Sequence, residues 1–143
     1  MRIILTLLFL VIPLLSSAAE YEAVVHVASY HPTSRSYNEV NPGIGLRANL
    51  DTFFIEFGAY KNSISKVSKY VGAGRRVLAY GNVSLNLLAG VITGYTPDPV
   101  PFILPELSIR VKKVNLLLVY IPEINARGVK TDSAFGLSVA VPF

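Results

Sequence analysis

The chain contains no cysteine and no tryptophan, and only 15% of its 143 residues are charged. The lack of cysteine excludes a disulfide framework, a thiolate metal site and a cysteine nucleophile. With 52% hydrophobic residues the chain is too apolar to be disordered, and its length suits one small domain. Its net charge of +4 is too small, and its charges too scattered, to indicate binding to nucleic acid.

The first 19 residues have the order of a secretory signal. Met1 and Arg2 precede an apolar run over 3–15, and the small residues of 16–19 follow. These are the n-region, the h-region and the cleavage site of a signal peptide, and the apolar run is too short to span a bilayer as a helix. We therefore expect cleavage after Ala19, with a signal peptide over 1–19 and one domain over 20–143.

The rest of the chain lacks any run of the roughly 18 apolar residues that a transmembrane helix needs. Hydrophobic residues alternate with a period of two in eight segments, 21–31, 43–51, 53–62, 70–80, 83–95, 102–111, 113–121 and 133–143. Each is close to the roughly 10 residues with which a tilted strand crosses a bilayer. The sequence predicts an all-β fold, an eight-stranded antiparallel transmembrane β-barrel.

The last segment alternates most clearly and ends the chain on Phe143. Phe135, Leu137 and Val139 share one face, and Gly136 and Ser138 lie on the other. Such a strand resembles the terminal strand of Gram-negative outer-membrane barrels, so we expect an outer-membrane location. A soluble β-sandwich or lipocalin-like barrel also alternates but has its apolar face inside, and this alternative stays open.

The residues expected to face inward divide into two halves if both ends of the mature chain lie in the periplasm. The lower half holds six charged residues that we expect to form ion pairs, because buried charges must be paired. These are Glu22, Glu56, Glu106, Arg47, Arg76 and Arg110. His26 lies on the same face as Glu22, and a paired interior residue is the simplest reading of it.

The upper inward positions are small or apolar. They are Ala28, Tyr30, Gly43, Gly45, Gly58, Tyr60, Gly72, Gly74, Leu88, Gly90, Ile92, Leu104, Leu117, Val119 and Ile121. Side chains normally fill an eight-stranded barrel, so glycines here predict an apolar well that suits one hydrocarbon chain. The alternative is that the glycines mark strand bends and close packing.

Six segments, in order, resemble the lipid A palmitoyltransferase (PagP) family. They are 37–46 (YNEVNPGIGL), 58–63 (GAYKNS), 70–74 (YVGAG), 89–91 (AGV), 99–108 (PVPFILPELS) and 120–122 (YIP). Members of that family are eight-stranded outer-membrane barrels that move a palmitoyl chain from a phospholipid to lipid A. The resemblance implies the same substrates here, with an interior well for the acyl chain lined by Gly72, Gly74, Leu88, Gly90, Ile92, Leu104, Leu117 and Val119.

The resemblance also implies an external catalytic cluster of His31, Asn62 and Ser63. Asn62 stands where the family has an aspartate, so no carboxylate is available there to stabilise an imidazolium. His26 is the alternative for the histidine. With the expected cleavage after Ala19, only Glu20 would precede the first strand, so we expect no counterpart of the family's N-terminal amphipathic helix. The segment from His31 to Tyr37 is expected to form a shorter external loop than the family's.

Two functions therefore remain open beside the soluble lipid carrier. The first is an outer-membrane phospholipid:lipid A acyltransferase, in which the acyl chain enters through breaks in strand pairing near Pro42 or near Pro101 and Pro105. The second is a non-catalytic outer-membrane barrel that binds lipid or modifies the cell surface. We expect a monomer without a cofactor, and no metal site, because two histidines and scattered carboxylates lack ligand spacing.

Overall fold

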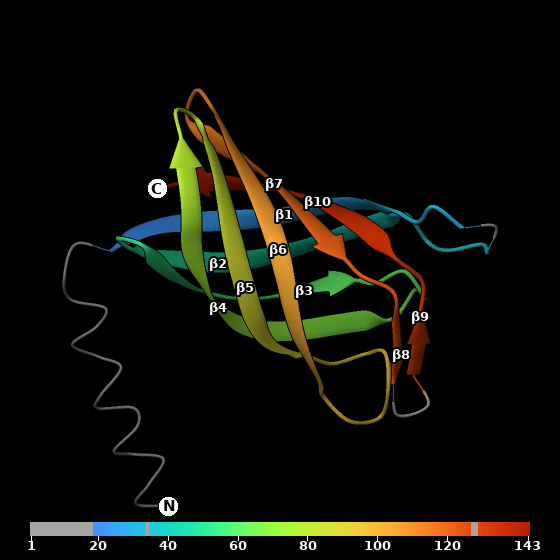
Figure 1. The fold of residues 1–143 in the computed structure, drawn as a ribbon. Helices are drawn as coiled ribbons and strands as arrows, with labels where there is room; N and C mark the ends of the chain where they lie inside the picture. Colours follow the sequence, from blue (N-terminus) through green and yellow to red (C-terminus); the bar gives the residue numbers. More distant parts are fainter. Residues whose placement is uncertain (1–18, 34, 127–128) are drawn as a thin grey trace, which may run out of the picture.

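The computed structural model describes residues 19–33, 35–126 and 129–143, in which β-strands alternate with turns and loops (Figure 1). The signal peptide expected over 1–19 lies outside the described residues except for Ala19. The strands are β1 Glu20–Tyr30, β2 Val40–Leu50, β3 Phe53–Lys61, β4 Val67–Tyr80, β5 Val83–Ile92, β6 Val100–Val111, β7 Val114–Ile121, β8 Ile124–Ala126, β9 Val129–Thr131 and β10 Ala134–Pro142. No helix in the described part is long and apolar enough to cross a membrane.

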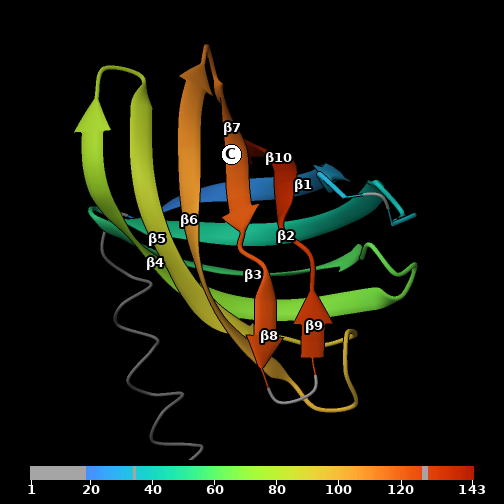
Figure 2. The same cartoon turned by 45° about the vertical axis from the view of Figure 1, so that its right-hand side comes forward.

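Eight of these strands close into an antiparallel barrel in the order β1, β10, β7, β6, β5, β4, β3, β2. This confirms the predicted fold class, and the strands begin and end within a few residues of the expected bounds. The sequence did not predict β8 and β9, which pair with each other in a separate hairpin between β7 and β10 (Figure 2).

The two ends of the barrel differ in their connections. Short turns at 51–52, 81–82 and 112–113 join strands at one end, where the Phe143 amide also donates to the Tyr21 carbonyl. Asp51, Gly81 and Lys112 have positive φ in these turns. The connections 31–39, 62–66, 93–99 and 122–133 lie at the other end. We call these the short-turn end and the long-loop end.

The outer face of the barrel is apolar and the inner face carries the buried charges. Ile44, Phe57, Leu87, Ile103 and Phe135 are all exposed on the outside. A soluble carrier would have the opposite arrangement, so the pattern is that of a barrel surrounded by lipid.

A β-bulge between His26 and Ala28 changes the face of every later residue in β1. Ala28 pairs with Leu137 and Tyr30 pairs with Phe135 on the outer face, and Tyr30 is 60% exposed. The prediction that Ala28 and Tyr30 face inward is therefore wrong. Ser29 takes the inward place, and its Oγ is buried without a hydrogen-bond partner in the described part of the chain.

Candidate functional site

The inner face toward the short-turn end is organised around one arginine. Arg47 Nε donates to Glu56 at 2.6 Å, and its two terminal nitrogens donate to the Glu106 carboxylate at 2.9 and 2.6 Å. Asn86 donates a further hydrogen bond to Glu106, and the Phe54 ring lies 4.1 Å from the Arg47 guanidinium. Both carboxylates and the guanidinium are thus removed from water but fully engaged.

Only part of the expected ion pairing forms. Arg47 pairs with both Glu56 and Glu106, whereas Glu22 accepts hydrogen bonds from the side-chain amides of Asn49 and Asn115. The prediction that three glutamates pair with three arginines is therefore wrong for Glu22, Arg76 and Arg110. Among the described residues Arg76 and Arg110 have no ion pair, and Arg110 Nε donates only a long bond of 3.4 Å to Asn115.

His26 belongs to a hydrogen-bonded chain in the middle of the barrel. Tyr70 donates its hydroxyl hydrogen to Glu56, which is also paired with Arg47. Tyr70 must then accept from His26 Nε2 at 2.9 Å, which leaves His26 Nδ1 to accept from the Ser138 hydroxyl at 2.9 Å. This geometry fits the interpretation of His26 as a paired interior residue.

Aromatic rings lie over most of the inward glycines, and Gly74, which was expected in the upper half, pairs with Phe54 near the 51–52 turn instead. A Cβ on Gly74 would lie 2.1 Å from the Phe54 ring, and one on Gly90 would lie 2.8 Å from the Phe102 ring. Tyr70 covers Gly45 and Gly58 in the same way. The space that these glycines leave is occupied by neighbouring rings, as expected for glycines that permit close packing.

Gly136 on β10 is different, because nothing lies within 4 Å of a Cβ built there. Its cross-strand neighbours are Val119 on β7 and Ser29 on β1. Leu117 lies on the same face of β7, two residues before Val119, and is 2% exposed. The interior therefore has space beside Gly136 on β10, whereas side chains fill it on the β3 to β5 side.

The wall of the barrel is incomplete next to this space. β6 pairs with β5 along its length from Val100 to Ile109, but its pairing with β7 ends at Glu106 and Val119. The part of β6 from Val100 to Pro105 is thus a free edge toward β7, and it contains Pro101 and Pro105, which lack the N–H that a ladder needs. Both prolines are exposed, which agrees with the break expected there.

His31 lies at the long-loop end and is buried, with 8% exposure. Its ring stacks on Tyr37 with a centroid distance of 4.2 Å, and Nδ1 has no hydrogen-bond partner among the residues that the structure describes. Burial lowers the pKa of His31, and the carboxylates of Glu39 and Asp132 oppose this shift. The imidazole is therefore neutral at pH 7 with a free nitrogen, the form that a general base requires.

Asn62 and Ser63 differ in how they are held. The Asn62 side chain is fully buried: Nδ2 donates to Ser68 Oγ and the Gly94 carbonyl, and Oδ1 accepts from the amides of Ile64 and Lys66. It holds the turn between β3 and β4 and has no donor left for a substrate. Ser63 is partly exposed, and its carbonyl accepts from the Asn38 amide at 2.8 Å.

The loops of the long-loop end meet at two consecutive residues. Tyr37 stacks on His31 and donates to Asp132 at 2.7 Å, and Asn38 binds the segment that carries Ser63. Arg35 also pairs with Asp132 at 3.5 Å, and the hydrogen bond from Tyr37 lowers the pKa of this carboxyl. We call His31, Arg35, Tyr37 and Asp132 the rim cluster. Sequence analysis missed Asp132 because no local pattern links residues this far apart.

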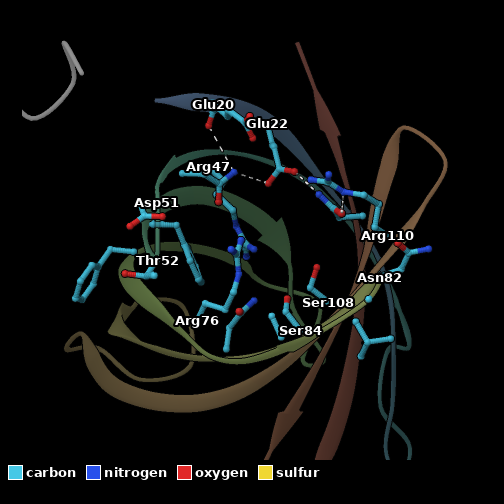
Figure 3. Close-up of a pocket in the computed structure, with 18 residues that line it drawn as sticks. Glu20, Glu22, Arg47, Asp51, Thr52, Arg76, Asn82, Ser84, Ser108 and Arg110 are labelled. Atoms are coloured by element: carbon cyan, nitrogen blue, oxygen red, sulfur yellow. Dashed lines mark hydrogen bonds between the residues drawn. The ribbon is translucent and has the colours of Figure 1, made fainter. Parts of the chain in front are cut away.

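A polar cavity of about 510 Å³ lies inside the short-turn end. Glu20, Glu22, Asp51, Thr52, Arg76, Ser84, Ser108 and Arg110 are among the residues that line it (Figure 3), and the Arg76 backbone amide donates to the Thr52 carbonyl at 2.7 Å. We call this cavity the vestibule. The Arg47 network separates it from the upper interior. Sequence analysis did not predict a cavity here, because it expected all six charges to pair.

Comparisons with known proteins identify the class of fold. No protein-family model and no curated protein sequence matches the chain. The barrel is similar to the solution NMR structure of the de novo designed TMB2.3, with a TM-score of 0.62 and 15% identity over 89% of this chain and 98% of that chain. It is also similar to the outer membrane protein Ail of Yersinia pestis, whose backbone structure was determined in a phospholipid bilayer nanodisc. That TM-score is 0.56, with 12% identity over 87% of this chain and 99% of Ail.

The chain therefore has the fold of an outer-membrane-type β-barrel. At these identities the likeness shows the fold alone. The lipid A palmitoyltransferase resemblance continues to rest on the six sequence segments.

Proposed function

We propose that this protein is an outer-membrane acyltransferase of a Gram-negative bacterium that moves an acyl chain from a phospholipid to lipid A. The long-loop end faces outward, as the short turns and both ends of the barrel-forming chain face the periplasm in barrels of this type. His31 and Ser63 act at that end. The proposal rests on the six segments together with the architecture of the upper interior.

The observation that carries the proposal is the free edge of β6 beside the open space over Gly136. An acyl chain that enters between β6 and β7 would contact Val119 and Leu117 without displacing a packed ring. The Arg47 network, below this space, would stop its descent. Of the residues expected to line the well, Leu88, Leu104, Leu117 and Val119 supply apolar side chains, whereas the Phe54 ring covers Gly74.

Acyl transfer requires a proton to leave the acceptor hydroxyl and another to reach the departing glycerol oxygen. The unpartnered Nδ1 of His31 can take the first proton as the lipid A hydroxyl attacks the ester carbonyl, and the imidazolium can return it to the leaving oxygen. The Ser63 hydroxyl would position the acceptor or the carbonyl. Tyr37 must move aside for His31 to meet a substrate, because its ring covers the imidazole.

The second candidate is a barrel that binds lipid without catalysis. One observation favours it. All hydrogen bonds of the Asn62 side chain lie within the turn and to its neighbours, so Asn62 neither carries the charge of the family's aspartate nor contacts a substrate in its place. In this reading the open space over Gly136 would still hold an acyl chain.

The test is expression in a Gram-negative host that lacks its own palmitoyltransferase, followed by mass spectrometry of lipid A. We expect a gain of one acyl mass, which is lost in Ser63→Ala and in His31→Gln. Ser65→Ala, in the same loop, is the matched control and should retain the product. If a heat-modifiable barrel in the outer membrane gives no acyl gain, catalysis is excluded and the lipid-binding candidate remains.

A further inference from the structure

Three consecutive residues, Tyr37, Asn38 and Glu39, connect the parts of the external site. The Tyr37 ring stacks on the His31 imidazole, and the Asn38 amide donates to the Ser63 carbonyl at 2.8 Å. Glu39 Oε1 accepts a hydrogen bond from the His31 backbone amide at 3.2 Å. Of these three side chains, that of Glu39 is the one with a negative charge at neutral pH.

The proposed acyl transfer needs a negative charge near the His31 ring. When His31 takes a proton it becomes an imidazolium in a place where the residue is only 8% exposed, and such a cation requires an anion nearby. Asn62 carries no charge, and its side chain is engaged in the turn between β3 and β4. The charge must therefore come from another residue.

Two carboxylates act on His31, and they differ in how far a cation offsets them. Burial lowers the pKa of His31, whereas Glu39 first and Asp132 second raise it. Asp132 pairs with Arg35 at 3.5 Å and accepts from Tyr37 at 2.7 Å. Glu39 has no ion pair within the described part of the chain. Its charge is thus the less compensated of the two.

The position of Glu39 is fixed by backbone as well as by side-chain contacts. The Glu39 carbonyl accepts from the Ser29 amide at 2.9 Å, which holds Glu39 against β1 two residues before His31. A single CH₂ group joins the imidazole to its own backbone, so a carboxylate that binds the His31 amide lies close to the ring. Glu39 is itself exposed, and water therefore screens part of its charge.

We propose that Glu39 is a positioning residue that stabilises the His31 imidazolium, in place of the aspartate whose position Asn62 occupies. The inference rests on the proposed acyl transfer for its catalytic consequence. The Glu39 carboxylate holds the His31 backbone in place and supplies the negative charge, while His31 Nδ1 takes the proton. Asp132, which Arg35 partly neutralises, has the smaller influence.

The first test measures the protonation of His31 directly, without any need for turnover. The chain has two histidines, so the full-length barrel labelled with ¹⁵N at histidine gives two sets of NMR signals, which His31→Gln assigns. Glu39→Gln keeps an oxygen for the His31 amide and removes only the charge. We expect it to lower the pKa of His31 further, and Asp132→Asn to lower it less.

The second test measures the initial rate of acyl transfer from phospholipid to lipid A by the purified barrel in micelles, as a function of pH. Glu39→Gln should slow the plateau rate about threefold to fivefold, the range of a solvent-screened charge interaction. A base acts in its neutral form, so the acidic limb of the profile should move to lower pH together with the pKa. Glu39→Asp, which keeps the charge, should recover part of the rate and of the shift.

The matched control is Glu123→Gln, which removes the same charge from another exposed residue at the long-loop end. It should leave both the His31 titration and the pH profile unchanged. A His31 pKa and an acidic limb that stay at their wild-type positions in Glu39→Gln overturn the inference, as does an equal shift in the control. If the wild type transfers no acyl chain but Glu39→Gln still lowers the pKa of His31, acyl transfer is wrong and the electrostatic pairing of Glu39 with His31 stands.

Discussion

The two halves of the barrel interior differ in the groups that fill them, which are charged and polar in one half and aromatic or absent in the other. In the middle of the barrel, Arg47, two glutamates and the Asn86 amide close the interior, and the vestibule lies between this network and the short turns. Toward the long loops, rings lie over glycines on one side and an open space remains over Gly136 on the other. The buried charges of the network must all be paired, whereas an apolar region with an incomplete wall can admit a chain from the membrane.

Removal of Arg47 should give the largest effect on stability. Arg47→Leu leaves Glu56 and Glu106 buried without their cation, so the free energy of unfolding should fall by about 3–5 kcal/mol. Urea unfolding in detergent micelles measures this change. Arg76→Leu removes an arginine that has no ion pair in the described residues, and should cost far less. Equal losses in the two variants would mean that the network does not hold the lower half together.

Two glycine substitutions should separate the filled side of the upper half from the open side. Gly90→Ala places a Cβ 2.2 Å from the Val71 carbonyl oxygen, so it should destabilise the barrel by about 1–3 kcal/mol. Gly136→Ala meets no atom within 4 Å and should leave stability nearly unchanged. The same unfolding measurement compares them, and a large loss in Gly136→Ala would contradict the open space.

Restoration of the family's carboxylate at Asn62 should be harmful. Asn62→Asp replaces the donor that binds Ser68 and Gly94 with an oxygen that faces the Gly94 carbonyl, so we expect a loss of about 1–2 kcal/mol. The lipid A product should not increase. A rise in product with an intact barrel would show that the turn rearranges to present the carboxylate.

Acidification should loosen the rim cluster, with the smallest effect of the four. Burial holds the pKa of His31 below its ordinary value of about 6.5, so its contribution is complete above that pH and is lost as the pH falls through the lowered pKa. The carboxylates of Glu39 and Asp132 favour the protonated ring and so make this loss smaller. Tyr37 and Arg35 are the other members of the rim cluster. Hydrogen-exchange protection of the Asn38 amide should fall between pH 7.5 and pH 5, and His31→Gln should remove that dependence.

The barrel could be predicted from the sequence because its signal is local. In strands such as 133–143 apolar and small residues alternate along the sequence, and turn residues separate one strand from the next. The bulge between His26 and Ala28 could not be predicted, since no residue type in the sequence marks it. This bulge is the reason that the prediction of an inward-facing Tyr30 is wrong. The β8–β9 hairpin was missed because its strands are only three residues long.

The interior contacts were less predictable than the strands. Cross-strand neighbours such as Arg47 and Glu56 follow from the register, but Arg47 also reaches Glu106 across the lumen, which spacing does not reveal. The role of Gly74 depended on whether a ring from β3 enters the space beside it, and Phe54 does. The position of Asp132 against Tyr37 depends on a loop whose path has no sequence signature.

The most direct test of the difference between the halves is to locate a bound acyl chain. Spin-labelled fatty acyl chains added to the isotopically labelled barrel in micelles would broaden NMR signals close to the label. The account predicts broadening of the Val119 and Leu117 methyl groups, with the side-chain amides of Asn49 and Asn115 unaffected. Broadening confined to outward methyl groups such as those of Ile103, with sharp Val119 and Leu117 signals, would contradict it.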